Sequence, residues 1–356
     1  MRLVRSFAVF CALALAALLM GGGPLPAPFS GAQPVLAATT LKAQFFLPKG
    51  HPLSKHLEQI YADIEKATNG EVKIQSFYAS ELVPLRQALD GLSNGTLDIL
   101  VGPGNYYSGK IALGDISIMP LNFKHYTDRA RAFYNEGIGK ILNKVYSKHG
   151  IEVVAPYNYF TGEVVIVRKG VSVNSLADLK GLKLRVAGGE LVQLVKALGA
   201  EPVFIAPPEL YTGLQRGTVD GAIFPSNDLV LLKLHEVSST VLLPDYIFSG
   251  PMMHFFMFNK AAFDGLSAAN RQAIEKVLHQ AALQDDRNSE GQLVAPFQAK
   301  AEAAGVKYVT LSAADIAASK AATDAARNAY IKYNTEQGNG AEAHQILNIL
   351  DRLTAR

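Results

Sequence analysis

The sequence predicts a two-lobed α/β protein, and three observations support this fold class. Short apolar or β-branched runs alternate with helical stripes in residues 41–101 and again in residues 182–224. Such alternation is typical of parallel sheets covered by helices. A phrase of eight residues recurs between the two regions, and the length of 356 residues suits two domains better than one.

The first region reads in order as strand 41–47, helix 54–68, strand 72–77, helix 84–92 and strand 97–101. Asn69-Gly70 ends the first helix and Asn94-Gly95 the second. The strand 97–101 is wholly apolar, as expected for a strand buried on both faces. We expect these strands to form a parallel sheet with right-handed crossovers.

The later elements follow the same rules. Residues 113–146 read as helical and connecting, and the strands 152–157 and 163–168 mark where the chain crosses between lobes. The second region contains strands at 182–186, 202–206 and 219–224 with helices between them, and residues 237–258 hold further strands. Helices are expected at 268–304, 313–334 and 341–353.

The repeated phrase is the strongest sign of two similar lobes. Residues 91–98 (GLSNGTLD) and 213–220 (GLQRGTVD) are identical at five positions. Two copies are too few for a solenoid, but they fit two related lobes with a cleft between them. Chance recurrence of a common helix-stop-strand phrase is the alternative.

The N-terminus predicts a secretory signal peptide, residues 1–37. Arg2 and Arg5 precede an apolar run that is too short to span a bilayer, and a small-residue cleavage site precedes Ala38. A retained membrane anchor is the alternative. Cleavage removes the single cysteine, Cys11, and two arginines, so the net charge falls from +3 to +1. An exported globular protein with no basic footprint for nucleic acid is expected.

Each apparent catalytic motif in the sequence lacks a feature that its chemistry requires. Residues 91–95 match G-x-S-x-G, but a helix precedes the serine and a strand follows it, which reverses the required order. Residues 104–110 approach a P-loop, but Ile111 stands where Ser or Thr should bind Mg²⁺. The histidines show no zinc-binding spacing. We therefore expect no enzyme activity, no cofactor and no metal.

Candidate binding residues lie at predicted strand ends. Arg185 ends the strand 182–186, where a parallel sheet opens its ligand crevice. Its guanidinium matches a carboxylate with two hydrogen bonds, although an arginine in a strand can also pair with a structural carboxylate. Tyr106 follows the strand 97–101 and Phe224 ends the strand 219–224, so both are candidates for a pocket wall.

The chain resembles the extracytoplasmic solute-binding proteins of tripartite ATP-independent periplasmic (TRAP) transporters. The resemblance covers nearly all of the mature chain and rests on segments 67–72, 94–98, 176–186, 196–203, 209–212 and 214–221. It implies a periplasmic binding protein fold with a long helix spanning both lobes. It also implies capture of a small organic acid and delivery to integral membrane permease subunits. The family's carboxylate-binding arginine falls on Arg185.

Two departures from the family pattern bear on the ligand. After Asp220-Gly221, Phe224 replaces the asparagine with which many members contact the ligand, and Val164 stands near the position where the sialic-acid-type members have a second arginine. Both changes favour a monocarboxylate with an apolar or aromatic body.

The predicted site and lobes follow from these interpretations. The ligand-binding set is Arg185, Phe224, Asn227, Asn105, Tyr106, Ser80, His51 and Tyr159. Residues 38–162 with about 250–285 are assigned to the first lobe, and 163–249 with about 286–356 to the second. The alternatives are a binding protein of an ATP-driven importer or sensor, and an exported hydrolase.

Overall fold

The computed structural model describes residues 38–159, 161–243, 248, 250–292 and 295–355. The predicted signal peptide lies outside the described residues. Residues 38–356 form one compact unit, and this unit contains two sheets. No helix among the described residues is both long enough and apolar enough to cross a membrane.

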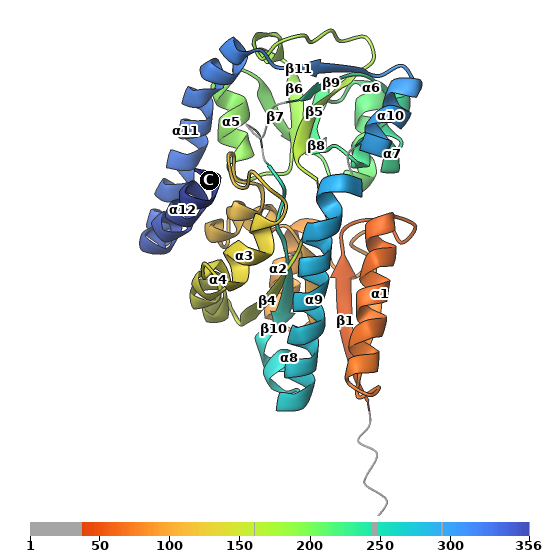
Figure 1. Cartoon of the computed structure of the whole chain (residues 1–356), viewed down its shortest axis with the longest axis vertical. Helices are drawn as coiled ribbons and strands as arrows, with labels where there is room; N and C mark the ends of the chain where they lie inside the picture. The colour runs from red at the N-terminus through yellow and green to blue at the C-terminus, as the bar shows by residue number, and fades with distance from the viewer. Residues whose placement is uncertain (1–37, 160, 244–247, 249, 293–294, 356) are drawn as a thin grey trace, which may run out of the picture. The chain divides into compact units, whose positions relative to one another are not determined.

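The first sheet has five strands in the order β2-β1-β3-β10-β4. Its strands β1, β4 and β10 are labelled in the lower part of Figure 1. They are β1 (Thr39–Phe45), β2 (Val72–Phe77), β3 (Ile99–Gly102), β4 (Ile151–Tyr157) and β10 (His254–Asn259). β1 pairs in parallel with β2 and β3, whereas β10 runs antiparallel to β3 and β4. The predicted parallel arrangement is therefore confirmed for the N-terminal strands, and β10 inserts from a distant part of the chain.

Helices cover the first sheet. They are α1 (Pro52–Ala67), α2 (Ala88–Ser93), α3 (Asp128–Tyr134), α4 (Ile138–Tyr146), α8 (Lys260–Asp264) and α9 (Ala268–Gln292). The helical connection predicted from residue 113 begins as a 3₁₀ segment, Ala112–Ile118, before α3 and α4. α9 packs along α1 and β4.

The second sheet has six strands in the order β11-β9-β5-β8-β6-β7. They are β5 (Glu163–Arg168), β6 (Lys183–Val186), β7 (Glu201–Phe204), β8 (Gly221–Pro225), β9 (Ser238–Leu243) and β11 (Lys307–Thr310). β6 is parallel to β7 and β8, and β5 is antiparallel to β8 and β9. The helices of this sheet are α5 (Leu191–Ala197), α6 (Leu210–Arg216), α7 (Asp228–Leu231) and α10 (Ala295–Ala303).

The repeated phrase has the same structural role in both lobes. The Asp98 carboxylate accepts a hydrogen bond from the Lys42 backbone N–H at 2.8 Å, and the Asp98 N–H donates to the Lys42 carbonyl at 2.9 Å. Asp220 makes the same pair of bonds with Lys183, at 3.1 and 2.8 Å. In each lobe the aspartate thus ties the turn before one strand to a neighbouring parallel strand. This shared geometry favours related lobes over chance recurrence.

The two C-terminal helices lie against both lobes. α11 (Ala313–Glu336) packs on α5 and on the 3₁₀ segment Ala112–Ile118, and α12 (Gly340–Thr354) packs on α11, α3 and α4. The apolar face of α12 joins the core of the first lobe through Ala343, Ile346, Leu350 and Leu353. Residues from about 286 to 356 were assigned to the second lobe, whereas the buried face of α12 lies in the core of the first. An amphipathic stripe predicts a buried face, but not which core covers it.

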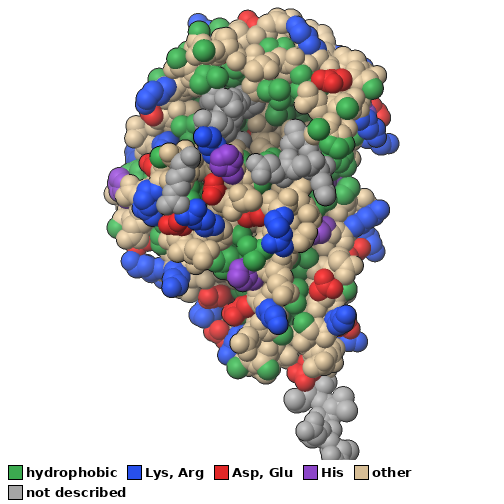
Figure 2. Space-filling model, in the orientation of Figure 1, with side chains coloured by type: hydrophobic (Ala, Val, Ile, Leu, Met, Phe, Trp, Pro, Cys, Tyr) green, Lys and Arg blue, Asp and Glu red, His purple; other side chains and the backbone are tan. Residues whose placement is uncertain are grey.

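Charged side chains are mixed on the surface. On the face shown in Figure 2, Lys and Arg side chains alternate with Asp and Glu side chains, most densely over the lower half of the view. No large area of one sign is visible on this face. This distribution agrees with the small net charge of the sequence.

Candidate ligand-binding site

A small cavity is lined by residues at or near the ends of strands of both sheets. Its volume is about 20 Å³, which is room for about one water molecule. The lining residues come from both lobes: Phe46, Pro103, Asn105, Tyr106, Ile118, Met252 and His254 from the first, and Glu163, Arg185, Ala187, Phe224, Pro225 and Asp228 from the second. The lobes are therefore in contact around a set of aromatic, apolar and charged side chains.

Arg185 is the central cation of this cavity. It lies in β6, is 1% exposed, and donates from Nε to the Ile205 carbonyl at 3.0 Å and from Nη1 to the Ile223 carbonyl at 3.2 Å. Ile205 follows β7 and Ile223 lies in β8, so the strands on either side of β6 fix the guanidinium. Its Nη2 reaches the Tyr106 hydroxyl at 3.4 Å, and its Cζ lies 4.8 Å from the centre of the Phe224 ring.

The Arg185 guanidinium has donors to spare. An arginine carries five N–H groups, and the three hydrogen bonds named above use one N–H each of Nε, Nη1 and Nη2. No carboxylate of the described chain lies within ion-pair distance of it. A buried cation without an anionic partner is costly, so the arrangement suits an anion supplied from outside.

Tyr106 and Asn105 bring the first lobe to this cation. The Tyr106 ring makes edge contacts with Phe46 of its own lobe at 5.7 Å and with Phe204 of the other lobe at 6.2 Å. Burial raises the pKa of Tyr106, so its hydroxyl stays protonated. The Asn105 Oδ1 accepts from Ser117, whereas its Nδ2 is buried without a partner among the described residues.

Glu163 lines the cavity but is not among the residues predicted from the sequence. It is the first residue of β5, is 3% exposed and lines the same cavity as Arg185. Burial raises the pKa of its carboxyl group to about 7, against the opposing effect of the Arg185 charge. β5 is antiparallel to β8, and Glu163 pairs with Pro225, so the start of β5 lies beside the carboxyl end of β8.

His254 occupies the equivalent position in the first sheet. It is the first residue of β10, which runs antiparallel to β3, and it lines the cavity. Burial, together with the charge of Arg129, lowers the pKa of His254 well below its ordinary value. Its imidazole is therefore neutral. Both Glu163 and His254 are polar residues at the start of an apolar strand, but the antiparallel direction that brings each to the cavity is seen only in the structure.

His51 and Asp228 join the lobes next to the cavity. The His51 Nδ1 accepts from the Leu53 N–H and caps α1, while its Nε2 lies 3.3 Å from the Asp228 Oδ1 at the start of α7. Both side chains are at most 2% exposed. His51 therefore does not line the cavity itself but lies next to Asp228, which does.

The other predicted residues lie further away. The Asn227 Oδ1 accepts from the Thr161 hydroxyl at 3.0 Å beside the crossing between the lobes. Ser80 lies in the turn after β2, with φ +62°, and Tyr159 stacks on His56 with ring centres 4.5 Å apart. The structure thus brings Arg185, Phe224, Asn105 and Tyr106 together, with His51 one contact away. It does not place Ser80, Asn227 or Tyr159 at the cavity.

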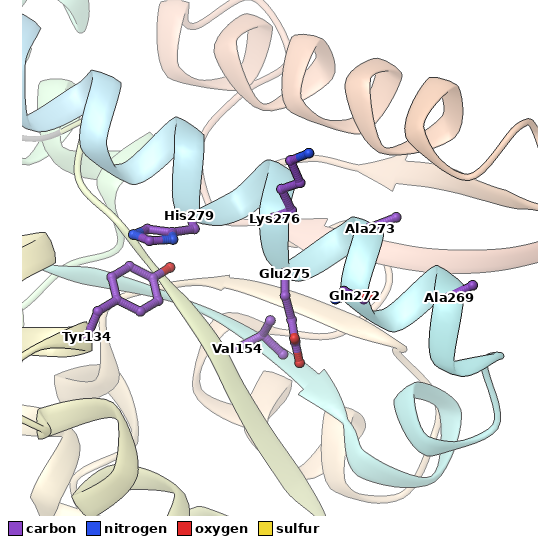
Figure 3. Close-up of a pocket in the computed structure, with 8 residues that line it drawn as sticks. All are labelled: Tyr134, Val154, Ala269, Gln272, Ala273, Glu275, Lys276 and His279. Carbon is purple, nitrogen blue, oxygen red and sulfur yellow. The ribbon is translucent and has the colours of Figure 1, made fainter.

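A larger groove of about 730 Å³ lies on the first lobe (Figure 3). It runs along α9, with Tyr134 and Val154 opposite, and the Tyr134 and His279 rings lie beside each other with centres 4.2 Å apart. All of its residues come from one lobe. We place the ligand site in the smaller cavity because buried charged groups of both lobes meet there.

Two α/β lobes that enclose a buried cation define the class of two-lobed solute-binding proteins. The chain belongs to the bacterial extracellular solute-binding proteins of family 7, the DctP family, whose model matches residues 44–333. This confirms the resemblance to TRAP solute-binding proteins. The family consists of solute-binding proteins rather than enzymes.

Individual relatives support this membership. The chain is 29% identical over 252 residues to the 2,3-diketo-L-gulonate-binding periplasmic protein YiaO of Escherichia coli, covering 69% of this chain and 74% of the relative. It is similar in fold to a TRAP solute-binding protein of Desulfovibrio salexigens with bound orotic acid, with a TM-score of 0.77, 24% identity, and coverage of 89% and 99%. The Bordetella pertussis receptor DctP7, which binds pyroglutamic acid, also has a TM-score of 0.77, with 18% identity and coverage of 88% and 100%.

Proposed function

We propose that this protein is a periplasmic receptor of a TRAP transporter that captures a small organic acid and delivers it to membrane permease subunits. Arg185 holds the ligand carboxylate with its spare N–H groups. The observation that carries this proposal is a guanidinium fixed by two backbone carbonyls and buried without a carboxylate partner in the described chain.

Closure of the lobes accompanies capture. A cavity of about 20 Å³ is too small for an organic acid, so the lobes separate to admit the ligand and then close around it in an arrangement wider than the one seen here. Hinge closure of this kind shifts an equilibrium between open and closed states. The His51–Asp228 approach and the Arg185–Tyr106 bond are contacts between the lobes that must break or lengthen to admit the ligand.

The charge balance favours a ligand with one carboxylate. Among the described lining residues, Arg185 alone keeps a positive charge, because His254 is neutral. The family resemblance implies that Val164 stands near the position of a second arginine in some members. Phe46, Ile118, Phe224 and Met252 add an apolar wall. The proposed ligand is therefore a monocarboxylate with an apolar or aromatic portion.

The proposal is tested by calorimetry and thermal shift with protein of residues 38–356 and a panel of mono- and dicarboxylic acids. A ligand that binds only the folded state raises the melting temperature by mass action. Removing one partner of a buried charge pair costs roughly 2–5 kcal/mol. Arg185→Gln is thus expected to raise the Kd at least thirtyfold.

Arg168→Gln is the matched control. Arg168 lies in the same sheet, but pairs with Asp220 at 3.0 Å and is partly exposed, so its loss should leave the Kd unchanged. Arg185→Lys keeps the charge and guards against misfolding of the glutamine variant; it should bind with intermediate affinity. Undiminished binding of the acid by a folded Arg185→Gln protein would contradict the proposal.

A further inference from the structure

Glu163 gives the cavity a second recognition element of opposite sign. The Glu163 Oε2 is buried and has no hydrogen-bond partner among the described residues. No ion pair within 4 Å joins this carboxyl group to Arg185 in the described part of the chain. Buried polar atoms in native proteins are almost always hydrogen-bonded. An acceptor at the cavity wall with no protein partner therefore suits a donor on the ligand.

The electrostatics of the cavity point the same way. Arg185 supplies one positive charge, and the Asp228 Oδ1 lies 3.3 Å from the His51 Nε2 with no hydrogen bond between the two atoms in the described chain. A ligand carboxylate on Arg185 would lie near the ionised form of Glu163, and like charges at a shared site repel. A donor on the ligand relieves this repulsion, most strongly when the donor is an ammonium group.

We propose that Glu163 is a specificity residue, and that the ligand is a small carboxylic acid that also carries an N–H or O–H donor directed at the Glu163 carboxyl group. Arg185 and the unpartnered Asn105 Nδ2 face the carboxylate, and Glu163 faces the donor. This inference rests on the proposed receptor function and narrows its substrate class. An amine, a lactam nitrogen and a hydroxyl group share the required chemistry.

A matched series of five-membered rings tests the inference. Cyclopentanecarboxylate and tetrahydrofuran-2-carboxylate have no donor beside the carboxylate, pyroglutamate has a neutral N–H, proline an ammonium group, and 1-hydroxycyclopentanecarboxylate a hydroxyl group. Calorimetry on the wild-type protein is expected to give at least a tenfold lower Kd for the best donor-bearing acid than for either donor-free ring. Donor-free rings that bind within threefold of every donor-bearing ring would overturn the proposal.

Two substitutions then locate the effect. Glu163→Met keeps the length of the side chain and removes both oxygens, so the ratio of the Kd of a donor-free acid to that of a donor-bearing acid should fall to about one. Glu163→Gln keeps one acceptor oxygen without the charge, so it should raise the Kd of proline more than the Kd of pyroglutamate. Glu201→Met is the control, because Glu201 also begins a strand of the second sheet but is exposed; it should change neither ratio. A preserved preference in Glu163→Met would refute the role of Glu163.

Proton exchange gives a readout that a purely structural role would not move. The groups that line the cavity near Glu163 are Arg185, Tyr106, Asp228 with its partner His51, and His254. With a Glu163 pKa of about 7, an ammonium-bearing acid should release protons on binding at pH 7, and a donor-free acid should take them up. Calorimetry in two buffers of different ionisation enthalpy measures this exchange, and Glu163→Gln should abolish it. Exchange that persists in Glu163→Gln would contradict the assignment.

Failure of this inference is distinguishable from failure of the receptor function. If donor-free acids bind as tightly as the others but still require Arg185, the receptor function stands and the role of Glu163 falls. If acids bind independently of Arg185, the proposed function itself falls.

Discussion

Arg129→Met should destabilise the folded protein by removing a buried ion pair that ties the long helix α9 to α3. The Arg129 Nε lies 3.1 Å from the Asp286 Oδ1, Nη1 donates to the Met252 carbonyl at 2.9 Å, and Nη2 donates to the Ser289 hydroxyl at 3.1 Å. Arg129 is fully buried and Asp286 nearly so. The substitution keeps much of the side-chain volume and removes all of these donors.

The magnitude follows from what remains around Asp286. Breaking a buried pair by removing one partner costs about 3–5 kcal/mol. Asp286 keeps hydrogen bonds from the Ala130 N–H and the Asn158 amide, both at 2.9 Å, so we expect the lower end, about 3 kcal/mol. At roughly 2 cal/mol/K of unfolding entropy per residue, this is a fall of about 4–5 °C in melting temperature for a folded region of this size.

Urea unfolding followed by circular dichroism measures this loss. Arg131→Met is the control, because Arg131 lies on the same helix, pairs with Glu136 at 3.0 Å and is 40% exposed. Exposed ion pairs contribute at most about 1 kcal/mol. A loss in Arg129→Met no larger than that in Arg131→Met would refute the reasoning.

The pH dependence of the same variant provides a second check. Burial raises the pKa of Asp286 to about 6, and the Arg129 charge opposes this rise. Without Arg129 the folded-state pKa rises further above the unfolded value of about 3.9. The folded variant then binds a proton that the unfolded chain does not, so its stability falls as the pH rises from about 4 through the folded pKa. The difference from wild type should be larger at pH 8 than at pH 5.

Two further predictions concern closure and acidity. Gly189→Ala should weaken ligand binding, because Gly189 has a φ of +59° and an added Cβ would lie 3.0 Å from the Asp115 Cγ of the other lobe. Gly181→Ala is the control: Gly181 has a φ of +79°, but an added Cβ would meet no atom within 4 Å, so this variant should lose stability without losing affinity. Equal Kd values for the two variants would contradict this prediction. Burial raises the pKa of Glu190 to about 7 and that of its neighbour Asp115 well above its usual range. Protonation of this pair therefore favours the folded state, and the free energy of unfolding of the wild-type protein should fall as the pH rises from 5 to 7.5. Glu190→Gln should flatten that slope in urea titrations; an unchanged slope would argue against a shared proton.

Local sequence patterns were sufficient for the lobes and for part of the site. The phrase at 91–98 and 213–220 predicted two related α/β lobes, because helix stops and strand starts depend on neighbouring residues. Arg185, Tyr106 and Phe224 were found because the carboxyl ends of parallel strands meet at one edge of a sheet.

What the sequence alone left undecided depends on distant contacts. Glu163 and His254 start strands that run antiparallel to their neighbours, and local patterns do not encode this reversal. It brings Glu163 to the same end of the second sheet as Arg185, and His254 to the end of the first sheet that lines the cavity. The pairing of His51 with Asp228 and the packing of α12 on the first lobe likewise join residues far apart in the chain. The sequence by itself determined the elements and the central cation, whereas only the tertiary structure decided which acidic and aromatic groups surround that cation, because those groups are selected by strand direction and lobe contact rather than by spacing along the chain.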